Sequence, residues 1–108
     1  MISQGHELEV RIRNRLGMHA RPAAQFVRCA ARFGCEVYVS RDGIEINGKS
    51  IMGVMMLAAE QGAVIRIRAE GEDAARAVRE LAQLVEQGFH EDDEGRPVPD
   101  GGGDGAVS

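Results

Sequence analysis

One histidine and one arginine stand at the start of a helix-like pattern, and together they could accept and hold a phosphoryl group. Residues 17–23 have the sequence GMHARPA, so His19 lies where a loop ends and an alanine-rich helical pattern begins, with Arg21 two residues further on. The first turn of a helix has backbone N–H groups without intrahelical partners and the positive end of the dipole, which favours anions. Histidine side chains titrate close to neutral pH, so the nucleophilic neutral imidazole is well populated there. These residues alone also allow a plainer interpretation, in which His19 caps the helix and Pro22 fits its first turn.

The strands that must support this histidine follow from the hydropathy pattern. Apolar and polar residues alternate in segments 7–13 and 63–70, which predicts strands with one exposed face. Segment 36–41 is rich in β-forming residues and is followed by Asp42-Gly43, a hairpin turn signal, so we expect a short returning strand over 44–46.

Helical spacing of apolar residues predicts three helices. The first covers 20–33 and ends at Gly34, and the second is about two turns long behind Ser50, a good N-cap residue. We expect Asp73 to cap the third helix, which Gly88 closes. The order β-α-β-β-α-β-α then predicts an α+β fold in two layers, helices against a sheet whose other face is open.

Charge and composition bound the function classes. Residues 91–108 hold six acids and one base, a net charge of −5, which leaves 12 bases and 11 acids in residues 1–90. We therefore expect one folded domain over 1–90 and an acidic, Gly-rich, disordered tail over 91–108. A near-neutral body without a basic stripe argues against nucleic-acid binding.

No segment has the roughly 20 apolar residues of a membrane helix, and the first residues lack the basic and apolar regions of a signal peptide. We expect a cytoplasmic protein without membrane insertion. Cys29 and Cys35 have neither the spacing of a redox motif nor that of a zinc site, so we expect no metal and no cofactor.

A second motif, with the sequence KSIMGVMML over residues 49–57, lies about 30 residues after the first. With both motifs and the element order, the chain over about residues 6–90 resembles HPr, the histidine phosphocarrier family of the bacterial phosphoenolpyruvate-dependent phosphotransferase system. The resemblance implies an open-faced sandwich with a four-stranded antiparallel sheet packed under three helices. It also implies a phosphoryl-relay protein rather than a stand-alone enzyme, a monomer that accepts from enzyme I and donates to an enzyme IIA-type protein.

The resemblance also implies roles for single residues. His19 matches the phosphorylated histidine, and Arg21 matches the arginine that pairs with the phosphoryl oxygens. The backbone N–H groups of Ala20 and Arg21, with Pro22, match the helix start at the site. Ser50 matches a serine that a kinase phosphorylates and a phosphorylase restores in many bacteria, although capping alone also explains it. The expected partner-binding surface consists of Arg28, Ile51, Met52 and Met55.

The sequence fits more than one branch of the family and more than one function. Leu16 is similar to the nitrogen-related regulatory branch of the family, whereas segment 49–57 resembles members under serine-kinase control, so sugar uptake and nitrogen-type regulation both fit. A regulatory binding module, whose docking depends on phosphorylation of His19 or Ser50, is the alternative function. A small RNA-binding domain would require both motifs to be coincidental, and the sequence lacks RNA-stacking aromatic residues on a basic sheet.

Overall fold

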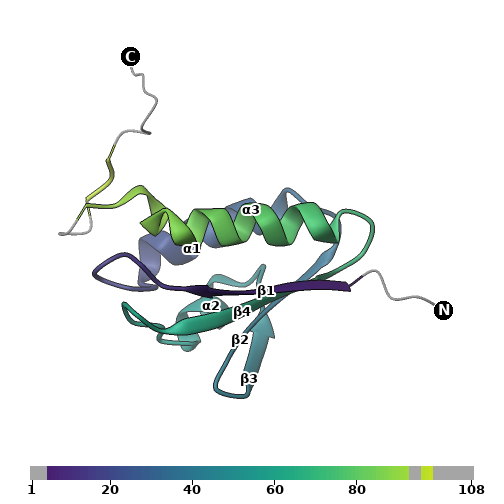
Figure 1. The fold of residues 1–108 in the computed structure, drawn as a ribbon, viewed down its shortest axis with the longest axis horizontal. Coiled ribbons are helices and arrows are strands. Elements are labelled where there is room, and N and C mark those ends of the chain that lie inside the picture. Colours follow the sequence, from purple (N-terminus) through teal and green to yellow (C-terminus); the bar gives the residue numbers. More distant parts are fainter. Residues whose placement is uncertain (1–4, 93–95, 99–108) are drawn as a thin grey trace, which may run out of the picture.

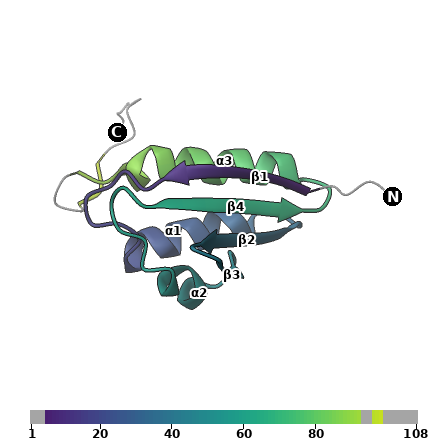
Figure 2. The same cartoon turned by 60° about the horizontal axis from the view of Figure 1, so that its bottom comes forward.

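The computed structural model describes residues 5–92 and 96–98, which form one antiparallel sheet covered on one face by helices. The strands pair in the order β1-β4-β2-β3. The elements are β1 (Gly5–Arg11), α1 (Ala20–Ala31), β2 (Glu36–Arg41), β3 (Ile44–Asn47), α2 (Ile51–Met56), β4 (Val64–Glu70), α3 (Ala74–Glu86) and the 3-10 turn η1 (Gly88–His90). Figure 1 shows α1 and α3 together above the sheet, and Figure 2 shows α2 beside β3.

The predicted fold class is confirmed, and most elements end within a residue or two of their predicted limits. The hairpin forms at Asp42 and Gly43, whose φ angles of 52° and 83° are those of a tight two-residue hairpin turn. The first helix ends at Ala31 rather than at Phe33, although the Phe33 side chain is still buried.

The core lies between the sheet and the two long helices. Alternate residues of the two central strands face the helices, among them Ile65, Ile67 and Val39. Phe26 of α1 and Leu81 of α3 are fully buried against them, so helical and strand periodicities meet in one apolar layer. This layer fixes the start of α1 relative to the sheet.

Asp73 does not cap α3 through its side chain, which corrects the prediction from the sequence. It is the N-cap residue of α3, but its side chain makes no capping hydrogen bond. The two carboxylate oxygens instead accept hydrogen bonds from the backbone N–H groups of Gly34 and Cys35, both at 3.1 Å. The Gly34 N–H group is the main cause of the lowered pKa of Asp73. The carboxylate therefore joins the α1–β2 turn to the start of α3.

The chain after α3 turns back toward the body. The Phe89 side chain is fully buried, and both Phe89 and His90 have left-handed backbone conformations, with φ of 56° and 57°. Glu91 pairs with Pro97 in an isolated β-bridge, and the Val98 N–H group donates to the His90 carbonyl oxygen at 2.7 Å. The predicted domain boundary after residue 90 thus lies beside residues that contact one another. That boundary and the predicted tail stay predictions, and residues 93–95 and 99–108 lie outside the described residues.

Candidate functional site

The loop before α1 is held in place by a buried asparagine. Asn14 has only 5% of its surface exposed, and its Nδ2 atom donates to the Gly17 carbonyl oxygen at 2.8 Å. The Gly17 N–H group donates back to the Asn14 carbonyl oxygen at 3.2 Å. These two bonds close the loop just before His19.

Gly17 is required by the path of this loop. Its φ of +73° lies in the left-handed region, where side chains are disfavoured. A Cβ atom there would lie 2.5 Å from the Ala59 carbonyl oxygen. That carbonyl oxygen also accepts a hydrogen bond from the Met18 N–H group at 2.8 Å, so the loop packs directly on the segment after α2.

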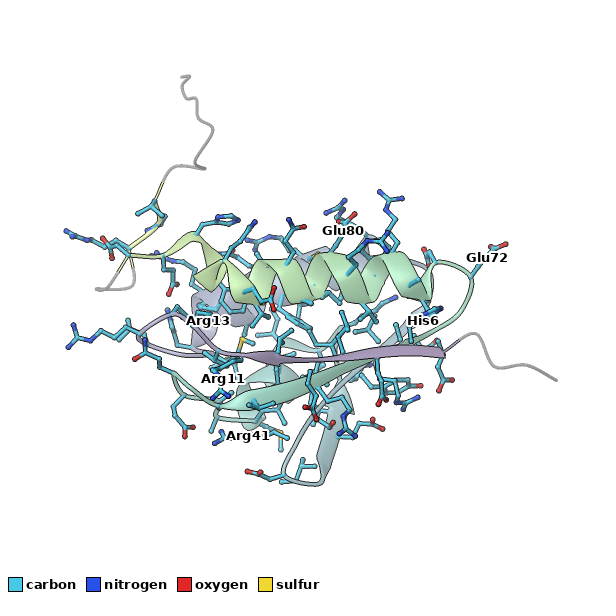
Figure 3. All side chains as sticks on the ribbon, viewed as in Figure 1. His6, Arg11, Arg13, Arg41, Glu72 and Glu80 are labelled. Atoms are coloured by element: carbon cyan, nitrogen blue, oxygen red, sulfur yellow. The ribbon has the colours of Figure 1, made fainter. Side chains whose placement is uncertain are left out.

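Arg41 supports that segment from the neighbouring strand. Its guanidinium donates to the carbonyl oxygens of Leu57 and Ala58 at 3.1 and 2.8 Å, and it forms an ion pair with Glu60 at 2.8 Å. Figure 3 shows Arg41 with Arg11 and Arg13 toward the end of the sheet from which the loop before α1 departs. The position of the loop before His19 therefore depends on contacts from β2 as well as on its own turn.

His19 is the N-cap residue of α1, as the sequence predicted. Its backbone is extended, with φ −92° and ψ −167°, and its carbonyl oxygen accepts the first helical hydrogen bond, from Ala23 at 2.9 Å. The side chain makes no capping bond and has 35% of its surface exposed, so His19 caps the helix through its backbone alone. Pro22 follows in the first turn, so Ala20 and Arg21 are the helix residues before it that carry N–H groups.

A carboxylate from the C-terminal segment contacts the imidazole. The Nε2 atom of His19 lies 3.2 Å from Oε2 and 3.5 Å from Oε1 of Glu91, whose side chain is completely buried. The Nδ2 atom of Asn14 donates to the same Oε1 atom at 3.0 Å. The loop before α1, the start of α1 and the C-terminal segment therefore meet at one ring.

The second motif forms α2 and an exposed apolar surface. The Ser50 hydroxyl accepts a hydrogen bond from the Gly53 N–H group at 3.0 Å, so the predicted N-cap is confirmed. Val54 is fully buried and anchors the helix, and Arg28 on α1 is exposed. The exposed apolar residues of α2 are Ile51, Met52, Met55 and Met56.

The structure brings the predicted residues into two neighbouring groups. His19, Ala20, Arg21 and Pro22 share the start of α1, and the α2 residues lie on a helix that packs against α1. Asn14, Glu91 and Met56 were not among the residues that the sequence predicted for the site. Met56 continues the apolar run of the second motif, whereas nothing in the local sequence connects Glu91 to His19.

In the described part of the chain, no group of three or more metal-ligating side chains lies together. Within the same residues, no helix is long and apolar enough to cross a membrane.

A family model described as the PTS HPr component phosphorylation site matches residues 6–87 of the chain. The chain belongs to the HPr family. Phosphocarrier protein HPr of Xylella fastidiosa (strain Temecula1) is 48% identical over 86 residues, which cover 80% of this chain and 97% of that protein. HPr-like protein Crh of Bacillus subtilis is 43% identical over 79 residues, which cover 73% and 93% of the two chains.

The fold agrees with solved HPr structures. The crystal structure of HPr-C-His from Thermoanaerobacter tengcongensis matches with a TM-score of 0.77 at 42% identity, covering 81% of this chain and 98% of that chain. The HPr family identity makes the chain a phosphocarrier of the phosphotransferase system rather than a stand-alone enzyme. Glu91 lies beyond the residues that the HPr family model matches.

Proposed function

We propose that His19 accepts a phosphoryl group from enzyme I and passes it to an enzyme IIA-type protein. The observation that supports this most directly is the position of His19 at the start of α1, with a partly exposed ring beside the helix N-terminus. Arg21 neutralises charge on the phosphoryl oxygens, and the N–H groups of Ala20 and Arg21 supply donors at the helix start. Phosphoryl transfer depends mainly on such positioning and charge neutralisation.

A relay role follows from what the site can hold. One nucleophile, one arginine and a helix start can carry a phosphoryl group, but the described residues include no cluster of acids that could bind a metal and phosphoenolpyruvate. The phosphoryl group must then come from a larger donor enzyme. This requirement supports enzyme I as the donor.

The test is phosphoryl uptake from labelled phosphoenolpyruvate in the presence of enzyme I. We expect one acid-labile adduct on the wild-type chain and none on a His19→Ala variant. His6→Ala is the matched control, because His6 is exposed on β1 and lies at the far end of the sheet (Figure 3). Uptake at the wild-type rate by His19→Ala would refute the assignment.

We propose a partner-binding surface formed by Arg28, Ile51, Met52 and Met55. The three apolar side chains are 46%, 75% and 40% exposed, and such neighbouring exposed apolar groups are typical of protein interfaces. Ser50 lies at the edge of this surface and is the proposed phosphorylation site of a serine kinase, with a phosphorylase restoring it. A phosphate there would repel acidic partner residues and would be costly to desolvate in an interface.

The second candidate function is a regulatory binding module with little phosphoryl flux. The similarity to HPr-like protein Crh favours it, because that relative is named as HPr-like rather than as a phosphocarrier. Measured turnover between enzyme I and candidate acceptors distinguishes the two. Fast transfer to a sugar-system or a nitrogen-type acceptor also identifies the branch.

The cytoplasmic location and the monomeric state stay predictions. One solved relative is described as an HPr dimer from Thermoanaerobacter tengcongensis. The molar mass of the chain in solution, measured by light scattering, decides between the two states.

A further inference from the structure

We propose that Glu91 is a positioning residue for phosphoryl transfer, one that keeps the His19 ring in the tautomer whose Nδ1 atom is the nucleophile. This inference rests on the proposed function of His19. Glu91 lies outside the residues that the HPr family model matches, so the family match gives it no role.

The contact geometry determines which ring nitrogen carries the proton. An ionised carboxylate only accepts hydrogen bonds, so a neutral ring that bonds to Glu91 through Nε2 must carry its proton on Nε2. The Nδ1 atom then keeps its lone pair. For Nδ1, no hydrogen-bond partner is found among the described residues.

Asn14 fixes the carboxylate from the other side. Its Nδ2 atom donates both to the Gly17 carbonyl oxygen and to Glu91 Oε1, at 2.8 and 3.0 Å. Both partners are acceptors, so the amide must face them with its NH2 group. Oε1 is thereby held between Asn14 and His19, whose Nε2 atom lies 3.5 Å from it with hydrogen-bond geometry, while Oε2 lies 3.2 Å from Nε2.

Burial makes the carboxylate effective. The Glu91 side chain has no exposed surface, and among the described residues its Oε2 atom has no hydrogen-bond partner apart from the close approach of His19 Nε2. A buried charge without full hydrogen bonding is costly, and a positive charge on the neighbouring ring offsets that cost. The Glu91 carboxylate is therefore placed to accept a hydrogen bond from the ring nitrogen that it faces.

The segment that carries Glu91 is itself held in place. Phe89 is fully buried two residues earlier, and the Glu91 N–H group donates to the Gly88 carbonyl oxygen at 3.1 Å. The bridge between Glu91 and Pro97 closes the other side. The carboxylate is presented by a turn with its own anchors.

The transfer step balances with no further reactant. The Nδ1 lone pair of His19 forms the new N–P bond, while the bond between phosphorus and the donor atom breaks and its electron pair returns to that donor atom. The His19 ring becomes positive, and its proton stays on Nε2 beside the Glu91 carboxylate. When the phosphoryl group leaves for the acceptor, the Nδ1–P electron pair returns to the ring, which is neutral again.

Substitution Glu91→Gln gives a sharp test. The Asn14 NH2 group keeps the new amide oxygen toward itself, so the glutamine NH2 group takes the Oε2 position, 3.2 Å from His19 Nε2, and disfavours a proton there. An amide in place of an orienting carboxylate imposes the wrong tautomer in this way. Glu91→Ala removes the acceptor without imposing the opposite tautomer.

Two measurements on the full chain decide the proposal. Nitrogen-15 NMR of the neutral ring should find the proton on Nε2 in wild type and largely on Nδ1 in Glu91→Gln. Phosphoryl uptake from enzyme I should slow about tenfold in Glu91→Ala, the size expected for a lost hydrogen bond to a charged group, and further in Glu91→Gln. Glu86→Gln, the same charge change at an exposed position on α3, is the matched control and should behave as wild type.

The outcomes separate the proposal from the function it rests on. If wild type takes up no label, the proposed function of His19 fails. If wild type is labelled and Glu91→Gln matches its rate, or keeps its proton on Nε2, the role of Glu91 is refuted. Circular dichroism of each variant should match wild type, and a lost fold in both Glu91 variants would make Glu91 a structural residue instead.

Discussion

Replacing Gly17 with alanine should destabilise the protein and disturb the site at the same time. The new Cβ atom would lie 2.5 Å from the Ala59 carbonyl oxygen and 2.9 Å from the Glu60 Cα atom, and both are backbone atoms. The Met18 N–H group donates to the same Ala59 oxygen. Relief of the clash must therefore lengthen a bond one residue before His19.

The expected loss of stability in Gly17→Ala has two parts. A residue with a side chain in the left-handed region costs about 1–2 kcal/mol. Displacing packed backbone adds roughly 1–3 kcal/mol, as for an overpacked core. The free energy of unfolding should fall by about 2–5 kcal/mol, which for a domain of this size lowers Tm by roughly 10 °C or more.

The substitution Gly43→Ala measures the cost of the left-handed conformation alone. Gly43 also has a positive φ, +83°, but nothing lies within 4 Å of its would-be Cβ atom. Urea unfolding of both variants gives the clash as the difference between the two losses, and phosphoryl uptake should slow only in Gly17→Ala. If Gly17→Ala lowers the free energy of unfolding no more than Gly43→Ala does, the close contact with Ala59 does not constrain residue 17, which refutes the prediction.

Three further predictions concern charge. Arg21→Lys keeps a positive charge but loses the planar fork, so phosphoryl uptake should slow with the circular dichroism unchanged, and an equal rate would remove the bidentate role. Ser50→Asp should weaken enzyme I binding while Ser50→Asn, which keeps a cap without charge, should not, and identical dissociation constants in a titration would contradict the docking switch. The lowered pKa of Asp73 means that its carboxylate stabilises the fold fully above its ordinary value of 3.8 and loses that effect as the pH falls below it. The stability difference between wild type and Asp73→Ala should therefore shrink below that pH in urea unfolding, whereas exposed Glu72→Ala should show no such trend.

The features that the sequence predicted well depend on residues close together in the chain. The hairpin at Asp42 and Gly43 follows from local turn chemistry, and Ser50 bonds to an N–H group three residues later. His19 could be placed because a loop, a proline and helical spacing meet within a few residues. Such local rules need no knowledge of the tertiary structure.

The features that the sequence could not predict depend on distant partners. Asp73 satisfies every local rule for an N-cap, but its carboxylate bonds to backbone N–H groups 39 and 38 residues away. Glu91 is 72 residues from His19 and belongs to an acidic, Gly-rich composition that predicts disorder. In both cases a tertiary contact outweighs the local preference, and only the fold specifies that contact.

A phosphoryl carrier must release its group as readily as it accepts it, and on the proposed function Pro22 limits how tightly the start of α1 can hold one. A helix start normally offers backbone N–H donors throughout its first turn, but proline has none, so Ala20 and Arg21 supply the donors before it. Each hydrogen bond to a charged group contributes about 1.5–3 kcal/mol, so one further donor would strengthen retention roughly tenfold or more. On the same proposal Glu91 acts on the ring instead, because a carboxylate beside Nε2 keeps the proton there and leaves the Nδ1 lone pair to accept the group. On the proposed function, the short donor set keeps the phosphoryl group from being trapped, while the buried carboxylate determines which ring nitrogen accepts it.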